Sequence, residues 1–278
     1  MKPFPETASL DEIDDLSGHL WIQELPTGGQ FRFQVAASGL ITFGTPDETF
    51  TGVEAVPYSH RRAAETISKQ LDRRALQTAI EQPETVTFFG CATRNEGIDY
   101  DWDALPPFVG IDVWSPNKES VLPPDAATTI FNRLGLPTLP PVKKEAPAAY
   151  TDLSRYETAA EFPSSAWRTG KAAALLIRDK TAGRIKIQRP GTESPPEPAT
   201  DPPAELAAQY ATDERIELTI DTLTEHEQPP TVDAIRDRLI ADVAREAYAH
   251  LRGDNAHITS MPEFQSVVAE RVQKHARS

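Results

Sequence analysis

The sequence predicts an α+β protein in which mixed antiparallel sheets with helices are followed by a small all-helical C-terminal domain. Up to about residue 190, apolar side chains recur at every second position between turn residues, which is the period of a β-strand. After a proline-rich run, they recur at steps of three and four, as they do on one face of a helix. The expected boundaries are therefore 1–190 for the α+β domain, 191–203 for a linker and 204–278 for the helical domain.

The first part of the α+β domain is expected to hold three short strands, over residues 18–44. Leu20 and Ile22 alternate with their neighbours, and Phe31 and Phe33 then lie on one face of a second strand. Glycine-containing turns, TGG at 27–29 and SG at 38–39, separate the strands. The sequence then predicts a helix over 59–82 with Ser59 as its cap, strands over 85–93 and 108–114, and a helix from Pro124 to Gly135.

The rest of the chain reads as a loop, a hairpin and helices. Prolines break the segment that runs to about residue 150, and a hairpin follows over 173–178 and 184–188. The run RPGTESPPEPATDPP cannot hold a regular helix or ladder, so it is expected to be a linker. Beyond it, Thr212 and Thr231 are placed to cap helices, and Ser260 with Glu263 has capping-box spacing.

Composition narrows the classes of function. The formal charge of −14 and the pI near 4.9 disfavour attraction of the whole protein to nucleic acid or to an anionic membrane. Such an acid excess suits the salt-rich cytoplasm of an extreme halophile, and the plainer alternative is an ordinary acidic protein. Cys91 is the single cysteine, so neither an internal disulfide nor a multi-cysteine zinc site is expected. With no signal-peptide pattern and no long apolar run, a cytoplasmic protein without a disulfide-linked or membrane partner is predicted.

Considered one at a time, few residues indicate a catalytic, metal-binding or phosphate-binding role. The six histidines lack metal-ligand spacing, and no serine lies in a nucleophile-elbow pattern. The acidic run 99–103, DYDWD, could gather a hard cation, but it lacks the glycine and distal glutamate of a calcium loop. It is therefore expected to be a solvated loop with a buried Trp102. Arg184 and Lys186 share one face of a predicted strand and could grip a phosphate, although alternating surface cations are common.

The order of three stretches carries more information than any single residue. They are WIQELPTGGQFRFQVAASGLITFG, TFFGCATRNEGIDYDWDALPPFVGIDVW and SSAWRTGKAAALLIRDKTAGRIKIQ. In this order they resemble the blocks of the ATP-dependent RNA ligase family, which belongs to the covalent nucleotidyltransferase superfamily. The resemblance covers about residues 18–190 and implies a ligase-type nucleotidyltransferase domain with an appended helical module.

The resemblance also implies a chemistry, and the sequence departs from it at the nucleophile. Members of the family form a covalent lysine–AMP intermediate and seal RNA ends with a divalent metal. Their first block runs glutamate, lysine, any residue, aspartate, glycine. The same places here hold Glu24, Leu25, Pro26, Thr27 and Gly28, so the nucleophile position falls on Leu25.

Further departures point the same way. Cys91 stands where a glutamate follows FFG, and Ile111 where an aromatic residue stacks on adenine. Ala173 opens the block that usually begins with glutamate and glycine, whereas Lys186, with Arg184 nearby, keeps the charge of the last block. The nucleotide-pocket positions implied by the resemblance are Glu24, Leu25, Thr27, Gly28, Cys91, Ile111, Ala173, Arg184 and Lys186; no catalytic residue and no metal ligand is assigned.

Three functions follow as hypotheses. Lysine adenylation needs an unprotonated amine at the α-phosphate, and a leucine side chain cannot supply it. The first hypothesis is a pseudoenzyme that has lost adenylation and keeps the fold for a binding or regulatory role in RNA metabolism. The second is an active ligase with a displaced lysine, Lys171 or Lys69. The third is an interaction protein that acts through its acidic helical tail. ATP with Mg or Mn is expected only if the activity is retained, and RNA ends or a protein are the expected partners.

Overall fold

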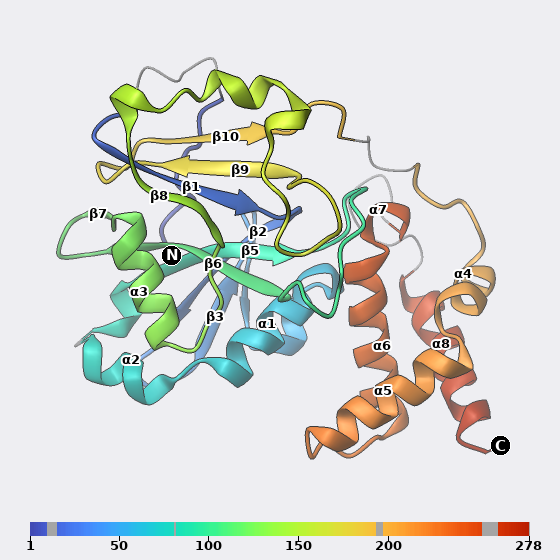
Figure 1. The fold of residues 1–278 in the computed structure, drawn as a ribbon. Coiled ribbons are helices and arrows are strands. Elements are labelled where there is room, and N and C mark those ends of the chain that lie inside the picture. The colour runs from blue at the N-terminus through green and yellow to red at the C-terminus, as the bar shows by residue number, and fades with distance from the viewer. Residues whose placement is uncertain (10–15, 81, 193–196, 252–260, 278) are drawn as a thin grey trace. The chain divides into compact units, whose positions relative to one another are not determined.

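The protein is described by a computed structural model over residues 1–9, 16–80, 82–192, 197–251 and 261–277, and it divides into two compact units (Figure 1). The first unit comprises Met1–Thr93 and Ile98–Ser194. The second comprises Arg94–Gly97 and Pro195–Ser278. The predicted fold class is confirmed: antiparallel sheets with helices form the first unit, and helices form the second. None of the helices in the described ranges combines the length and the hydrophobicity that crossing a bilayer requires.

The first unit contains two sheets whose paired strands are all antiparallel. The six-stranded sheet has the order β4 (Thr49–Thr51), β3 (Ile41–Gly44), β2 (Gly28–Val35), β5 (Thr87–Thr93), β6 (Phe108–Ser115), β7 (Ser120–Val121). The four-stranded sheet has the order β10 (Arg184–Gln188), β9 (Ala174–Arg178), β1 (His19–Leu25), β8 (Pro141–Pro147). Because β1 and β2 belong to different sheets, the two residues between them carry the chain from one sheet to the other.

One face of the six-stranded sheet is covered by α1 (Tyr58–Gln70), α2 (Arg73–Ala79) and α3 (Pro124–Arg133) (Figure 1). The alternation predicted for β2 places Phe31 and Phe33 in this core, and both are fully buried. Phe33 stacks on Phe88 of β5 with ring centroids 4.7 Å apart, and Phe131 of α3 meets Phe88 edge to face. Such aromatic pairs contribute about 0.5–1.5 kcal/mol each beyond the area that they bury.

The outer face of the four-stranded sheet is covered by the 148–162 segment, which holds three short 3-10 helices, η4 (Ala148–Tyr150), η5 (Ser154–Glu157) and η6 (Ala159–Glu161). Leu20 and Ile22 of β1 pack on Phe162 there. Since side chains alternate along a strand, Gln23 and Leu25 lie on the opposite face of the sheet. That inner face meets β6 of the six-stranded sheet, and the candidate site lies between them.

The helical unit consists of α4 (Pro203–Tyr210), α5 (Asp213–Glu225), α6 (Val232–Glu246), α7 (Tyr248–Leu251) and α8 (Met261–His275). The predicted caps Thr212 and Thr231 are confirmed, since each side chain accepts a hydrogen bond from the backbone N–H three residues on. Ser260 lies outside the described residues. Residues 94–97 belong to this unit: Asn95 N–H donates to the Arg245 carbonyl (2.8 Å), and Ala249 N–H donates to the Asn95 carbonyl (2.9 Å).

Several sequence-based expectations about elements are wrong. The helix predicted over 59–82 is two helices, because Asp72 caps α2 by accepting from Ala75 N–H (2.8 Å) and so starts a new helix. Ser59 is not a cap; its hydroxyl contacts the ring of His60. The proline-broken segment contains β8, whose exposed charged residues and terminal prolines hide an edge strand from a search for alternation. Trp102 is half-buried, and its neighbour Tyr100 is the buried aromatic residue.

Candidate functional site

Leu25 lies at the end of β1, where it is paired with Ala174 of β9. It is half-buried and packs into an apolar group that fills the space between the two sheets. We call this group the inter-sheet apolar cluster; its members are Leu25, Ile98, Tyr100, Trp102, Leu105, Val109, Ile111, Leu139, Trp167, Ala173 and Leu176. Three nucleotide-pocket positions suggested by the sequence, Leu25, Ile111 and Ala173, therefore lie together in one hydrophobic contact group.

The turn after Leu25 is held close to β5. A Cβ on Gly28 would lie 2.3 Å from the Ala92 carbonyl oxygen and 2.6 Å from the Cys91 sulfur, so only glycine fits this approach. Thr27 N–H donates to the Tyr100 hydroxyl oxygen (3.2 Å). Burial raises the pKa of Tyr100 to about 12, so this hydroxyl stays protonated near neutral pH. The turn is thereby fixed against a neutral group, and Cys91 is enclosed beneath it.

Glu24 is buried and serves as a structural acceptor. One carboxylate oxygen accepts from the Ser165 hydroxyl (2.5 Å), and the other accepts from Ala166 N–H (2.7 Å). Burial raises the pKa of Glu24, and these two hydrogen bonds and the nearby Arg168 only partly oppose it. The carboxylate thus anchors the 163–172 segment to β1.

The segment that Glu24 anchors places a tryptophan in the inter-sheet apolar cluster. Trp167 N–H donates to the Ser165 hydroxyl oxygen (3.1 Å), and the Trp167 carbonyl accepts from Asp101 N–H (2.9 Å). The Trp167 side chain is 8% exposed. Two loops, 98–105 and 163–172, are therefore tied together over the end of β1, with Tyr100 and Trp167 closing the space beside Leu25.

A buried ion cluster lies at the other end of the same inter-sheet space; it consists of Asp112 of β6, Arg178 of β9 and Arg184 of β10. Asp112 receives Arg178 Nη1 at 2.7 Å on one oxygen and Arg184 Nη2 at 2.7 Å on the other. Arg178 also donates to the Ile111 carbonyl (2.6 Å) and to the Gln23 side-chain oxygen. Burial alone pushes the pKa of Asp112 upward, but the two guanidinium groups outweigh it and hold that pKa below its usual value.

The two cations of the last block have different positions. Arg184 belongs to the buried ion cluster, so its charge is already matched by Asp112. Lys186 lies two residues on in the same strand and is exposed, as is Gln188. Arg184 is thus held by Asp112, and Lys186 is the exposed cation of this face of β10.

The residues at this site do not fit a divalent metal. Each oxygen of Glu24 accepts a hydrogen bond from a neutral donor, and each oxygen of Asp112 is paired with a guanidinium group. Across the described ranges, no three His, Cys, Asp or Glu side chains come together in a metal-binding group. Asp101, in the acidic run, accepts from the backbone N–H groups of Asp103 and Ala104 (3.2 and 3.1 Å), which is the pattern of a local loop turn.

The structure brings together most of the sequence-predicted positions. Leu25, Ile111 and Ala173 are members of the inter-sheet apolar cluster, and Thr27, Gly28 and Cys91 lie at the turn that follows Leu25. Glu24 lies on the other face of β1, where it anchors the 163–172 segment, and Arg184 and Lys186 lie along β10. Sequence reasoning missed Trp167, Asp112 and Arg178. The aspartate of GIDVW and the arginine of LLIRD each interrupt an apolar strand, and a charge in a buried strand is a signal for a paired partner.

No protein-family profile matches the sequence, and no curated protein matches it either. Among solved structures, this chain is similar to an archaeal ATP-dependent RNA ligase, form 1, with 11% identity and a TM-score of 0.49 over 100% of this chain and 66% of that chain. It is also similar to the Naegleria gruberi RNA ligase with PPi, at 13% identity and a TM-score of 0.45, over 68% of this chain and 56% of that one. A mutant of the same ligase with ATP and Mn gives 13% identity and a TM-score of 0.44 over the same shares.

The chain thus spans 66% of the archaeal ligase and 56% of the Naegleria ligase. At these identities and TM-scores, the similarity concerns the fold alone and says nothing about activity.

Proposed function

We propose that this chain is an RNA-ligase-like protein that has lost lysine adenylation and keeps its fold for a binding or regulatory role in RNA metabolism. The observation that carries the proposal is the packing of Leu25, at the nucleophile position suggested by the block order, into the inter-sheet apolar cluster. A hydrocarbon side chain there offers no nitrogen to attack an α-phosphate. Tyr100, Trp102 and Trp167 belong to the same cluster as Leu25.

Two charged groups of the candidate site are engaged in internal contacts, whereas Lys186 is exposed. Arg184 is paired with Asp112, and Glu24 is hydrogen-bonded to Ser165 and Ala166. Transition-state stabilisation in phosphoryl transfer depends on groups held ready for developing negative charge. Arg184 cannot serve that purpose without breaking its pair with Asp112, which joins the two sheets, and Glu24 cannot do so without releasing the 163–172 segment.

The test is incubation of the full chain with ATP labelled at the α-phosphate, together with Mg²⁺ or Mn²⁺, followed by denaturing electrophoresis. We expect no labelled band. A band that persists in denaturant and disappears on acid cleavage of a phosphoramidate would contradict the loss of adenylation. An active RNA ligase run in parallel establishes that the conditions support labelling.

A displaced lysine is the competing hypothesis for an active enzyme. Lys171 is exposed beside Gly170, and Lys69 is exposed near the end of α1. Neither residue is a member of the inter-sheet apolar cluster. If labelling is seen, Lys171→Ala and Lys69→Ala identify the amine: loss of the band in one of them supports the displaced-lysine enzyme.

RNA binding is tested separately from adenylation. Lys186 is the exposed cation of β10, and phosphate contacts of this kind weaken with added salt because counterions are released. With a 5′-phosphorylated single-stranded RNA, fluorescence polarisation at low salt should show binding that Lys186→Glu reduces. Lys143→Glu, on the exposed β8 strand, is the matched control. No binding by the unaltered protein at low salt would remove the RNA role.

A further inference from the structure

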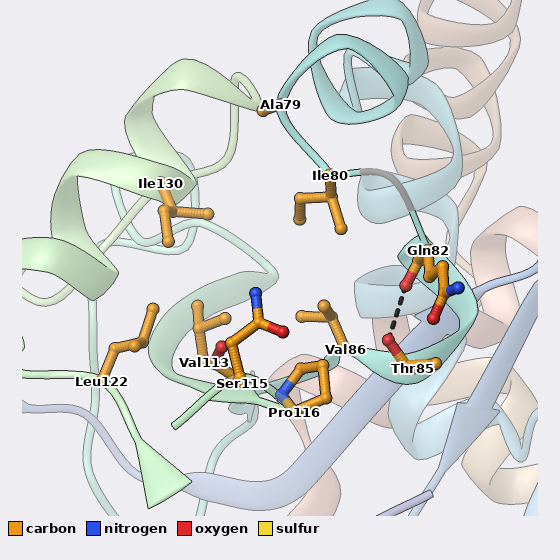
Figure 2. Close-up of a pocket in the computed structure, with 11 residues that line it drawn as sticks. Ala79, Ile80, Gln82, Thr85, Val86, Val113, Ser115, Pro116, Leu122 and Ile130 are labelled. Atoms are coloured by element: carbon orange, nitrogen blue, oxygen red, sulfur yellow. Dashed lines mark hydrogen bonds between the residues drawn. The ribbon is translucent and has the colours of Figure 1, made fainter. Parts of the chain in front are cut away.

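A groove on the first unit lies away from the candidate site, between α2 and α3. One part is a cavity of about 320 Å³ that reaches the turn after β6 (Figure 2). A second, more open part of about 740 Å³ continues along α2. The two parts adjoin each other at Ala79, Ile80 and Ile130, which line both, and we call them together the α2–α3 groove.

Apolar side chains make up much of the lining of the α2–α3 groove, and Gln82, Thr85 and Ser115 add polar groups at its edge near the turn after β6. Figure 2 shows Ile80 and Ile130 pointing toward each other across the cavity, with Val113 and Leu122 beneath them. Ile80, Leu122 and Ile130 are half-buried, so part of each remains in contact with water. Covering such side chains is favourable by about 25 cal/mol per Å² of apolar surface.

The rim of the groove is basic along its open part. Arg74 of α2 and Arg133 of α3 both line it and are both exposed. Within the part of the chain that the structure describes, neither guanidinium forms an ion pair. The carboxylate on the same rim, Asp72, is engaged as the cap of α2. The groove therefore suits an apolar anchor that is flanked by carboxylates.

In the helical unit, α5 carries an exposed apolar side chain with carboxylates near it, which complements the α2–α3 groove. Leu218 is 65% exposed, although most large hydrophobic side chains of the described residues are covered. Four exposed carboxylates lie on the same stripe of the helix, at Glu214, Glu217, Asp221 and Glu225. Their offsets from Leu218 of −4, −1, +3 and +7 residues place all five side chains within about 100° of the helix surface. Glu217 also lies 3.8 Å from the ring of His275.

We infer that the α2–α3 groove binds α5 of a second copy of this chain, with Leu218 on the apolar floor and the flanking carboxylates beside Arg74 and Arg133. This is the helix-in-groove mode of recognition, in which apolar anchors on one helix face fill a groove and charges set the orientation. If each copy both gives α5 and receives it, the contact closes as a symmetric dimer; a one-way contact would extend into longer assemblies. This inference is independent of the function proposed above, because none of these residues lies at the candidate site.

The first experiment measures the mass of the full chain in solution by size-exclusion chromatography with light scattering, across a dilution series. We expect self-association in the unaltered protein. Leu218→Asp places a charge on the apolar floor and should weaken association by about thirtyfold or more, the size of a hot-spot loss. Because Leu218 is exposed in the single chain, circular dichroism of this variant should match that of the unaltered protein.

Charge reversal gives the sharper test. Arg74→Glu with Arg133→Glu defines a groove variant, and Glu217→Arg with Asp221→Arg defines a helix variant. Each variant alone should remain a single chain, because its own contacts are repulsive. Mixing the two should restore a complex, since each acidic groove then meets a basic helix and each unaltered groove meets an unaltered helix.

Matched controls separate this contact from general effects of charge and hydrophobicity. Leu40 is another exposed leucine, at 52%, and Leu40→Asp should leave the mass unchanged. Lys143→Glu reverses an exposed cation that does not line the groove and should do the same. A single-chain mass at every concentration would overturn the inference, as would self-association that the groove and helix variants leave intact.

Discussion

The two ends of the space between the sheets of the first unit differ in the kind of side chain that fills them, charged at one end and apolar at the other. At one end, Asp112 is enclosed by Arg178 and Arg184. At the other end, Leu25 packs among aromatic side chains such as Trp167. Both ends join the same two sheets, yet one does so through charge and the other through apolar contact. The contrast shows where the fold depends on a specific pairing and where it depends mainly on shape.

The pKa values of two buried carboxyl groups, Asp112 and Glu24, shift in opposite directions. Asp112 lies between cations, so its pKa is lowered in spite of burial. Glu24 lies among neutral donors, so burial prevails and its pKa is raised. A carboxyl group whose pKa is lowered on folding stabilises the protein at pH values above its ordinary pKa. A carboxyl group whose pKa is raised on folding destabilises the protein at those pH values. One site therefore loses stability in acid, and the other gains it.

The largest expected effect is at the ion cluster. Asp112→Asn keeps the shape of the side chain but leaves two guanidinium groups buried without a counter-charge. Breaking a buried pair in this way costs about 3–5 kcal/mol. Urea unfolding followed by tryptophan fluorescence measures it in the first unit alone, because Trp21, Trp102, Trp114 and Trp167 all belong to that unit.

Two controls complete that measurement. Asp103→Asn removes an exposed carboxylate and should change the free energy of unfolding by no more than about 0.5 kcal/mol. Replacing Asp112, Arg178 and Arg184 together with apolar residues of similar volume should recover much of the loss, because no unpaired charge remains. If Asp112→Asn is no more harmful than Asp103→Asn, charge pairing does not hold this end together.

At the apolar end, we expect the free energy of unfolding to fall when side-chain volume is removed. Leu176 is 4% exposed and lies in the inter-sheet apolar cluster, and Leu176→Ala should cost about 2–4 kcal/mol. The expected cost is smaller than the largest costs known for Leu→Ala substitutions, because half-buried neighbours such as Ile111 can shift into the space that the side chain leaves. Leu176→Met should cost less than about 1.5 kcal/mol in the same fluorescence assay. Equal losses for alanine and methionine would show that packing is not the cause.

A third substitution, Leu25→Lys, tests whether a lysine at the apolar end can be adenylated. Leu25 is half-buried, so the ammonium of Leu25→Lys can reach water along the side of the cluster, and a loss of about 1–2 kcal/mol is expected. We expect no labelling with α-labelled ATP, since Cys91 and Ala173 still replace two carboxylates implied by the family resemblance. Robust labelling of this variant would mean that the pocket survives apart from one residue.

These expectations show what the sequence could and could not predict. Strand β2 was predictable because Phe31, Phe33 and Val35 alternate with polar residues, and β9 because a short continuous apolar run is typical of a strand that is buried on both faces. Strand β8 was not, because an exposed edge strand with prolines at both ends has no buried face to signal. The prediction that the nucleophile position falls on Leu25 rests on the block order alone. The ion pair between Arg178 and Asp112 joins residues 66 apart, and the bond from Ser165 to Glu24 joins residues 141 apart. Local patterns do not encode such pairings.

The smallest expected effect concerns the pH dependence that Glu24 contributes. Its pKa is raised above the ordinary value of 4.5 in the folded chain, so across the interval between these two values the folded state binds more protons than the unfolded state. Stability from this group therefore falls as pH rises through that interval. Glu24→Gln abolishes the titration, so the variant should lose this fall while keeping the opposite, acid-side loss from Asp112. Unfolding curves of both proteins, measured from pH 4 upward at about half-unit steps, check the difference in slope. Parallel curves for the two proteins would show that Glu24 titrates alike in the folded and unfolded chains, and that its burial among neutral donors has no electrostatic consequence.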